Sequence, residues 1–290
     1  MTSFALIIPY DASPRIIDGH SAEIGNEGYG RLGPVHARSA LFDLYGDHLR
    51  SRGGSAPVAA LIRILEPLDI SAPAVRTAVS RMVAQQWLQT DAGGGYALTE
   101  HARTWLDEAG IRIYRTDPVA WDGEWHLRVL APIADRARRE RVRSRLRFLG
   151  MAPVSDSTWV SPRASAEVDR LLESEDVETI AITGPRVEPG RALLDAFDLD
   201  ALATAYAGWQ DEAAALLARG ARDDLAAFVV RSELVHSWRK FLFTDPGLPR
   251  ELLPADWSGH RAAAFFDEHA TRLLPAASRF IDDQLQGDPR

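Results

Sequence analysis

The chain has 290 residues, a formal net charge of -8 and no cysteine. The lack of cysteine excludes disulfides, thiolate zinc sites and cysteine nucleophiles. Hydrophobic residues make up 46% and charged residues 26%, as in folded globular proteins, and the length suits two or three domains. No apolar stretch approaches the roughly 18 to 20 residues that span a bilayer, and the N-terminus lacks the pattern of a secretory signal. We therefore expect a cytoplasmic protein that has no membrane segment.

The acidic charge is distributed unevenly along the chain. Residues 36–116 contain 9 basic and 8 acidic side chains, whereas residues 188–290 contain 11 basic and 17 acidic side chains. The excess of acid therefore belongs mainly to the last hundred residues. An overall negative charge consequently does not exclude nucleic-acid binding by the first half of the chain.

The first 35 residues are rich in Gly, Pro, Ser and Asp and have no sustained periodicity, which is typical of a flexible N-terminal arm. The following segment, 36–116, has apolar spacings that predict helices over 36–50, 56–68 and 72–88. A hairpin with a glycine-rich tip follows over 87–99, and a further helix begins near Thr99. This order predicts a winged helix-turn-helix domain, in which the helix over 72–88 occupies the recognition position.

The predicted recognition helix has two different faces. Val75, Val79, Met82 and Gln86 share one narrow arc, which predicts that this side packs against a core. The opposite side is polar and mildly basic, and it carries Thr77, Ser80, Arg81 and Ala84, with Arg76 at its boundary. An ordinary solvent-facing helix would show the same pattern, so the position of the helix between two others and a hairpin favours DNA recognition.

The segment 117–187 has a different organisation. Its runs predict strands over 124–132, 151–155, 158–162 and 177–184, with helices over 135–149 and 164–174. The resulting order, βαββαβ, is that of a ferredoxin-like domain. The overall fold class is therefore α+β and multidomain, because residues 188–290 are predicted to be almost wholly helical.

The helix over 135–149 carries seven arginines, which raises the alternative of an RNA-binding protein. Most of them are two residues apart and so surround the helix instead of lining one face. Acidic neighbours also offer ion pairs along the helix. We favour a solvated or salt-bridging helix over a nucleic-acid surface.

The helical segment 188–290 contains one chemically varied cluster, which consists of His236, Trp238 and Arg239. The stretch is amphipathic, so core packing explains the aromatic residues well. The alternative is a ligand pocket in which an aromatic ring stacks on the ligand while His236 or Arg239 meets an anionic group.

Common catalytic motifs are absent from the sequence, which contains no GxSxG, no Walker-type loop and no HExxH. The eight histidines show no compact metal-ligand spacing. We therefore expect no enzymatic activity, no cofactor and no metal.

Three further stretches of the sequence are informative. They are ARSALFDLYGDHL with AVRTAVSRMVAQQWL, then WHLRVLAP with RSRLRFLGMAPVSDSTWVSPR, and finally LVHSWRKFLFTDPGLPRELLPADWSG. Together they resemble the PaaX family of bacterial transcriptional repressors of phenylacetic acid catabolism. The resemblance extends from about residue 36 to 285. It implies a middle domain similar to Cas2 and a homodimer that binds a palindromic operator on double-stranded DNA. It also implies release from the operator by phenylacetyl-CoA or a related acyl-CoA.

The resemblance places DNA contacts on two parts of the chain. Base reading falls on Arg76, Thr77, Ser80 and Arg81, and the wing contacts fall on Gly94 and Tyr96. The leader over 1–35 has no counterpart in the family pattern. A nuclease built on the Cas2-like domain is the other alternative, but it needs acidic ligands at the end of the first strand of that domain, where Ala131 and Pro132 stand.

Overall fold

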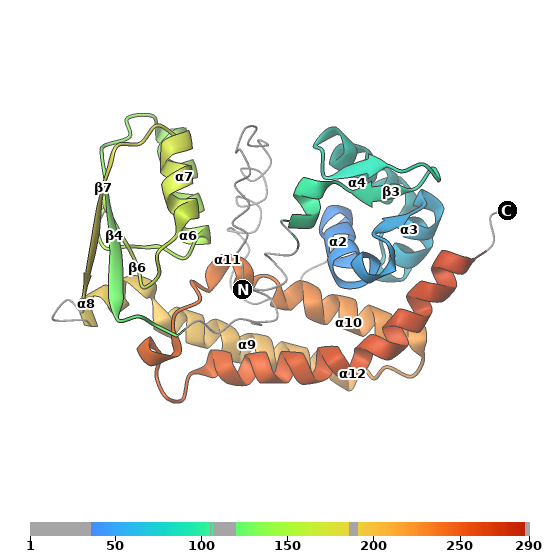
Figure 1. Cartoon of the computed structure of the whole chain (residues 1–290). Helices are drawn as coiled ribbons and strands as arrows, with labels where there is room; N and C mark the ends of the chain where they lie inside the picture. Colours follow the sequence, from blue (N-terminus) through green and yellow to red (C-terminus); the bar gives the residue numbers. More distant parts are fainter. Residues whose placement is uncertain (1–35, 105, 107–119, 186–190, 288–290) are drawn as a thin grey trace, which may run out of the picture.

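The computed structural model describes residues 36–104, 106, 120–185 and 191–287. The arm predicted over 1–35 lies outside these residues. Two lobes stand side by side on a base of helices (Figure 1). We call residues 36–106 the first lobe, residues 120–185 the second lobe and residues 191–287 the helical base. No helix in the described ranges has the length and apolar character needed to cross a membrane.

The first lobe combines three helices with a three-stranded sheet. Its strands are ordered β1-β3-β2, and both neighbouring pairs are antiparallel. Helices α2 and α3 lie toward the base, whereas α4 lies on the far side of the lobe (Figure 1). The elements are α2 (Ala37–Leu44), a π-helical turn (Tyr45–Leu49), β1 (Ser55–Ala56), α3 (Val58–Leu65), α4 (Ala72–Ala84), β2 (Leu88–Thr90) and β3 (Tyr96–Leu98).

The predicted elements of the first lobe are present, with two differences. The first helix is α-helical only to Leu44, continues as the π-helical turn and ends before Gly53, whose φ of 84° is accessible to glycine. The second helix begins at Val58, two residues later than predicted, because Ser55 and Ala56 instead form β1 and pair with β3. A strand of two residues has no periodicity, so sequence patterning could not reveal it.

The second lobe contains a four-stranded antiparallel sheet with strand order β5-β6-β4-β7. Helices α6 and α7 cover one face of this sheet (Figure 1). Their apolar side chains, such as Leu146 and Leu172, pack with Trp159 and Leu130 of the sheet. The predicted βαββαβ order is present in β4 (Glu124–Leu130), α6 (Arg136–Phe148), β5 (Ala152–Pro153), β6 (Thr158–Ser161), α7 (Ala166–Ser174) and β7 (Thr179–Pro185).

The other face of this sheet is partly covered by the helical base. Trp125 and Val160 pack there with Phe197 and Leu248 of the base. The two parts also approach closely at Gly150, where an added Cβ would lie 2.9 Å from the carbonyl oxygen of Pro246. The second lobe is therefore fixed to the base by a shared apolar core.

The helical base is built on three long helices that lie together beneath the lobes (Figure 1). Their core is rich in aromatic rings, and Trp238 stacks on Phe266 with ring centroids 4.8 Å apart. The helices of the base are α8 (Arg191–Leu194), α9 (Leu199–Ala218), α10 (Asp224–Trp238), α11 (Phe241–Thr244) and α12 (Ser258–Gln286). The prediction of an almost wholly helical segment is confirmed for the described residues.

The longest helix, α12, belongs to two separate cores. Residues such as Phe266 and Leu273 pack in the core of the base. Beyond Pro275, which lies inside the helix, Phe280 and Ile281 pack in the core of the first lobe. The helix changes direction along its length (Figure 1). A proline in a helix interior removes one backbone hydrogen bond and commonly produces a bend.

Candidate nucleic-acid interface and the lobe junction

Helix α4 buries one side and exposes the other. Val75, Val79 and Met82 are at most 2% exposed and lie in the core of the first lobe. The four predicted recognition residues are all exposed and belong to the opposite side, namely Arg76, Thr77, Ser80 and Arg81. In the described part of the chain, no ion pair or hydrogen bond occupies the side chain of Arg76 or Arg81. Both guanidinium groups are therefore available to an external anion or base edge.

One residue of the predicted packing arc is placed differently. Gln86 is exposed and lies outside α4, which ends at Ala84, and its φ is 59°. The helix ends here because Trp87 turns inward and its amide donates to the carbonyl oxygen of Met82 (2.9 Å). The periodicity was extended one turn too far in the prediction.

The predicted wing is the hairpin of β2 and β3, and its tip is held by Asp91. One carboxylate oxygen, Oδ1, accepts hydrogen bonds from the amides of Gly93 and Gly95, both at 2.8 Å. The other oxygen accepts a bond from the Ser55 hydroxyl. This hydroxyl, with the glycine amides, holds the pKa of Asp91 below its usual value. The tip itself, Ala92 to Gly94, is exposed and carries no charged side chain.

The two wing residues predicted to meet DNA differ in their environment. Gly94 is exposed and has a φ of 77°, so it presents only backbone to a partner. Tyr96 is half-buried, packs against the core of the first lobe, and its carbonyl oxygen accepts a hydrogen bond from the Tyr45 hydroxyl (2.6 Å). Tyr96 thus supports the wing from inside the lobe.

The first lobe is joined to the helical base by buried charges. Asp43 of α2 accepts from His236 Nδ1 at 2.9 Å and from the Arg239 guanidinium, with both residues at the end of α10. The side chains of Asp43 and Arg239 are only 9% and 10% exposed. Charges removed from water to this extent need partners, so the three groups depend on one another.

A second group of charges lies one turn away. Asp47 pairs with Arg231 of α10 at 2.6 Å and lies 3.2 Å from His48 Nε2. Burial lowers the pKa of His48 to about 4, since desolvation and the nearby Arg231 together outweigh the attraction of Asp47. His48 is therefore neutral at physiological pH. We call Asp43, Asp47, His48, Arg231, His236 and Arg239 the junction cluster.

The end of α12 provides further anchors for the first lobe. Arg52 pairs with Asp282 at 2.6 Å, and Arg63 donates to the backbone oxygen of Gln284 at 2.6 Å. These contacts join the turn after α2 and the last turn of α3 to the last turns of α12. Arginine side chains therefore link the first lobe both to α10 and to α12.

The predicted ligand cluster is not brought onto one surface. His236 and Arg239 turn toward Asp43 in the junction cluster. Trp238 is 3% exposed and lies in the core of the base, between Phe266 and Trp209. A small hollow lies beside Asp43, between α2 and α10, and its lining includes His48 and Phe228.

Several arginines of α6 are engaged within the second lobe. Arg138 and Arg141 pair with Glu175 of the segment after α7, at 3.8 and 3.2 Å. Arg143 and Arg147 lie over the ring of Trp159, with the guanidinium carbon 5.7 and 5.6 Å from its centroid. The favoured reading of a salt-bridging helix agrees with these contacts.

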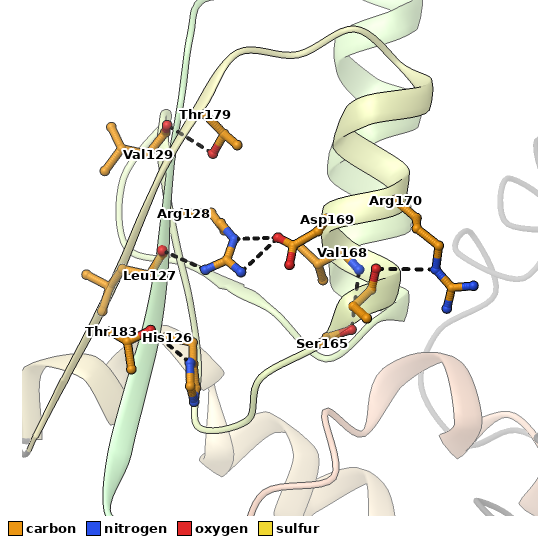
Figure 2. A network of polar contacts seen from close by, with 11 residues as sticks. His126, Leu127, Arg128, Val129, Ser165, Val168, Asp169, Arg170, Thr179 and Thr183 are labelled. Atoms are coloured by element: carbon orange, nitrogen blue, oxygen red, sulfur yellow. Dashed lines mark hydrogen bonds and ion pairs between the residues drawn. The ribbon is translucent and has the colours of Figure 1, made fainter. Parts of the chain in front are cut away.

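Strand β4 carries polar groups that the sequence patterns did not single out (Figure 2). Arg128 is 8% exposed and donates to Asp169 of α7 through Nε (3.0 Å) and a terminal nitrogen (2.8 Å). His126, two residues earlier on the same face, lies 3.2 Å from the Thr183 hydroxyl through Nδ1. In β4 the polar residues alternate with apolar ones, which is the pattern of a strand with two different faces. This alternation is the signal that could have identified His126 and Arg128.

Family models match all three parts of the chain. The PaaX-like protein model matches residues 36–102, the PaaX protein central Cas2-like domain matches 118–189, and the PaaX-like protein C-terminal domain matches 197–283. The model for the central region agrees with the expectation of a Cas2-like middle domain.

Whole-chain comparisons agree with the family models. The chain is 31% identical over 268 residues to the "Transcriptional repressor PaaX" of Escherichia coli (strain K12), covering 87% of this chain and 84% of that protein. A solved structure, the "Uncharacterized protein Rv0674 from Mycobacterium tuberculosis", has 25% sequence identity and a TM-score of 0.57, with 86% of this chain and 98% of that chain covered. The chain therefore belongs to the PaaX family.

Proposed function

We propose that the protein is a DNA-binding transcriptional repressor whose first lobe is a winged helix-turn-helix domain. The observation that carries the proposal is the exposed side of α4, where Arg76 and Arg81 have no partner in the described structure while the opposite side is buried. The order of helices and strands in this lobe, with the sheet order β1-β3-β2, supports the same reading. The printed name of the relative from E. coli, a transcriptional repressor, is consistent with it.

In this proposal α4 enters the major groove. A guanidinium group matches the O6 and N7 acceptors of guanine, so Arg76 or Arg81 reads a base while the other meets a phosphate. Thr77 and Ser80, which have short side chains, contact base edges or phosphates where the helix approaches closely. Gly94 approaches the DNA backbone, and Tyr96 acts by holding the wing in place.

We place a dimer contact on β7, which is the end strand of the sheet in the second lobe. Ile180 is 64% exposed and Ile182 is 48% exposed, and both lie opposite the half-buried Val129 and Leu127 of β4. An exposed end strand with apolar side chains is suited to pairing with an identical strand. A twofold dimer would present two copies of α4 to a palindromic operator.

The effector in this proposal is an acyl-CoA such as phenylacetyl-CoA, and it acts through the junction cluster. A CoA thioester carries several phosphate groups, which bind arginine well. His236 and Arg239 hold Asp43 of the first lobe. A phosphate that binds Arg239 competes with Asp43, so the ligand would favour an arrangement in which the first lobe is released from α10. Such a preference for one state is what a ligand needs to shift an equilibrium.

The proposal is tested by footprinting on the DNA upstream of the protein's own gene, with a panel of acyl-CoAs and free aromatic acids. We expect protection of a palindrome that disappears only with an aryl-CoA. Equal binding to unrelated DNA of the same length, with no protected site, would contradict repression through a specific operator. Protection that no acyl-CoA removes would leave the DNA assignment standing and contradict the effector assignment.

A further inference from the structure

Three potential metal ligands meet at the start of β4. Asp122, Glu124 and His126 each offer one ligand atom, and these atoms all lie within 4.8 Å of one another. Glu124 and His126 share one face of the strand, since they are two residues apart. Asp122 joins them because the chain turns just before the strand, where its Oδ1 accepts a hydrogen bond from the Glu124 amide (2.9 Å).

The second observation concerns the imidazole ring of His126. The residue is 8% exposed, and its Nε2 atom is buried without a hydrogen-bond partner. A buried polar atom that lacks a partner is costly, so it indicates a group that completes the site. The ring nitrogen on the far side from Thr183 points toward the beginning of β4 (Figure 2). Glu124 is the first residue of this strand.

The contact with Thr183 prepares this nitrogen for an ion. Thr183 stands directly opposite His126 on β7, and its hydroxyl oxygen lies 3.2 Å from Nδ1. When Nδ1 donates its proton to that oxygen, Nε2 carries the free lone pair of the neutral ring. Histidines that bind metals commonly donate their other ring proton in this way, which fixes the ring orientation.

The carboxylates supply the charge and the access that an ion requires. In the described part of the chain, no ion pair involves Asp122 or Glu124, so two carboxylates converge beside the imidazole ring of His126. Asp122 is exposed and Glu124 is half-buried, which leaves the site open to solvent. Ligands at about 2.0 to 2.2 Å from one ion lie closer together than 4.8 Å, so ion binding would require a small rotation of the carboxylates, of which that of Asp122 is exposed.

We propose that Asp122, Glu124 and His126 form a binding site for a divalent transition-metal ion of the Zn²⁺ type. One imidazole nitrogen with two carboxylate oxygens suits such an ion better than Mg²⁺ or Ca²⁺, which prefer oxygen ligands alone. The site lies apart from α4 and from the junction cluster, so it does not depend on the proposed function. The ion links the segment before β4 to the sheet of the second lobe. The histidine spacing predicted no metal, since motifs such as HExxH are helical and do not include alternation along a strand.

The test uses the full chain, freed of metal by chelation and titrated with ZnCl₂ in a calorimeter. We expect one tight equivalent per chain and at least tenfold weaker binding in Glu124→Gln and in His126→Ala. Thr183→Val removes only the partner of Nδ1 and should weaken binding about tenfold while leaving the ligands in place. The control is His101→Ala, which removes an exposed histidine in the first lobe and should change nothing.

Co²⁺ provides a spectroscopic measurement on the same proteins. A visible absorption band of bound Co²⁺ should appear in the parent chain and be lost in Glu124→Gln, which preserves the size of the side chain and tests the site even if His126→Ala unfolds. Absence of a tight equivalent, equal binding by Glu124→Gln, or loss of binding in His101→Ala would each overturn the proposal. Tight binding of Mg²⁺ but not Zn²⁺ would also overturn it.

Discussion

Asp47 of the first lobe and Arg231 of the helical base form an ion pair with 2.6 Å between Oδ1 and the guanidinium nitrogen. Their side chains are 11% and 3% exposed, so the pair is almost removed from solvent. The same guanidinium donates to the carbonyl oxygen of Ala270 on α12 at 2.8 Å. One arginine thus connects the lobe that carries α4 with two long helices of the base.

Removal of one charge from the junction cluster should uncouple the lobe from the base. Asp43→Asn leaves the guanidinium of Arg239 buried without its carboxylate, and we expect the free energy of unfolding to fall by about 3 kcal/mol. The double variant Asp43→Leu with Arg239→Met removes both charges, so it should cost less than Asp43→Asn alone. Urea unfolding measures both values.

The same variants test the effector model. Asp43→Asn should still bind the operator at low temperature but lose part of its response to an acyl-CoA, because the ligand no longer displaces a contact. Calorimetry on Arg239→Ala should show weaker binding of the acyl-CoA. Unchanged affinity in Arg239→Ala would argue against a role for the junction cluster in effector binding.

Burial of His48 makes stability depend on pH in a definite window. The pKa of His48 is about 4 in the folded protein and 6.5 in the unfolded chain, so the unfolded state binds the proton first. Stability is therefore lost as the pH falls from about 6.5 to 4, by up to roughly 3 kcal/mol. His269, whose pKa is also lowered by burial, contributes in the same direction.

Replacement of His48 separates its contribution to the pH dependence of stability from the contributions of other titratable groups. His48→Gln should flatten the dependence of the unfolding free energy on pH between 6.5 and 4, even if it lowers stability at neutral pH. His269→Gln is the matched control, and it should leave most of the slope. A slope that is identical in the parent chain and in His48→Gln would show that other groups cause it.

The roles of Arg76 and Arg81 can be distinguished by how the DNA affinity of their alanine variants depends on DNA sequence and on salt concentration. Arg→Ala at the position that reads a base should cost about 1 to 3 kcal/mol and relax the preference at one operator position. At the position that meets a phosphate, the same substitution should lower the affinity for all DNA sequences alike. It should also reduce by about one the slope of log affinity against log salt concentration. Arg163→Ala, an exposed arginine of the second lobe, serves as control. Unchanged operator binding in both Arg76→Ala and Arg81→Ala would refute the recognition role of α4.

The wing tip offers a graded series of glycine variants. Gly95→Ala should distort the wing, because the new Cβ would lie 2.9 Å from both Asp91 Oδ2 and the Ser55 hydroxyl. Gly94→Ala meets no atom within 4 Å but is strained at a φ of 77°, so it should cost about 1 kcal/mol. Gly93→Ala should be tolerated, since its nearest contact is 3.4 Å. The loss of operator affinity should therefore be smallest in Gly93→Ala, larger in Gly94→Ala and largest in Gly95→Ala.

The proposed dimer contact on β7 is tested by a charge on its apolar face. Ile180→Lys or Ile182→Lys should convert the dimer to a monomer in light scattering and weaken binding to a full palindrome much more than to a half-site. Leu225→Lys places the same charge on an exposed leucine of α10 and should have no effect on mass. If a dimer persists in the double variant Ile180→Lys with Ile182→Lys, the dimer contact lies elsewhere.

Local patterns predicted most elements because each helix and strand buries a regular set of side chains. The helix α4 is an example, since Val75, Val79 and Met82 alternate at helical spacing and are all buried. The same periodicity indicated the exposed arginines on the other side. Its limit is shown by Gln86, where the inward turn of Trp87 ended the helix.

Contacts between distant segments could not be predicted in this way. Asp43 and His236 are 193 residues apart, and nothing in either local sequence identifies the other as its partner. The aromatic spacing around Trp238 was compatible with a pocket or a core, and only the packing against Phe266 distinguishes them. The ligands at the start of β4 were overlooked for a different reason, since their spacing of two is meaningful only once a strand is known.

Helix α12 contributes side chains to two cores, and so does α10. Each half of this helix is fixed in its own core, and Pro275 lies between Leu273 and Ala277, the flanking members of the two. Phe228 of α10 also packs in the core of the first lobe, and Arg231 of α10 pairs with Asp47, so a change in the backbone at Pro275 would have to move α10 together with the lobe. Since α4 belongs to the same core as Phe228 and Ile281, the distance between the two α4 helices of a dimer would be set by α10 and α12 together, far from the DNA.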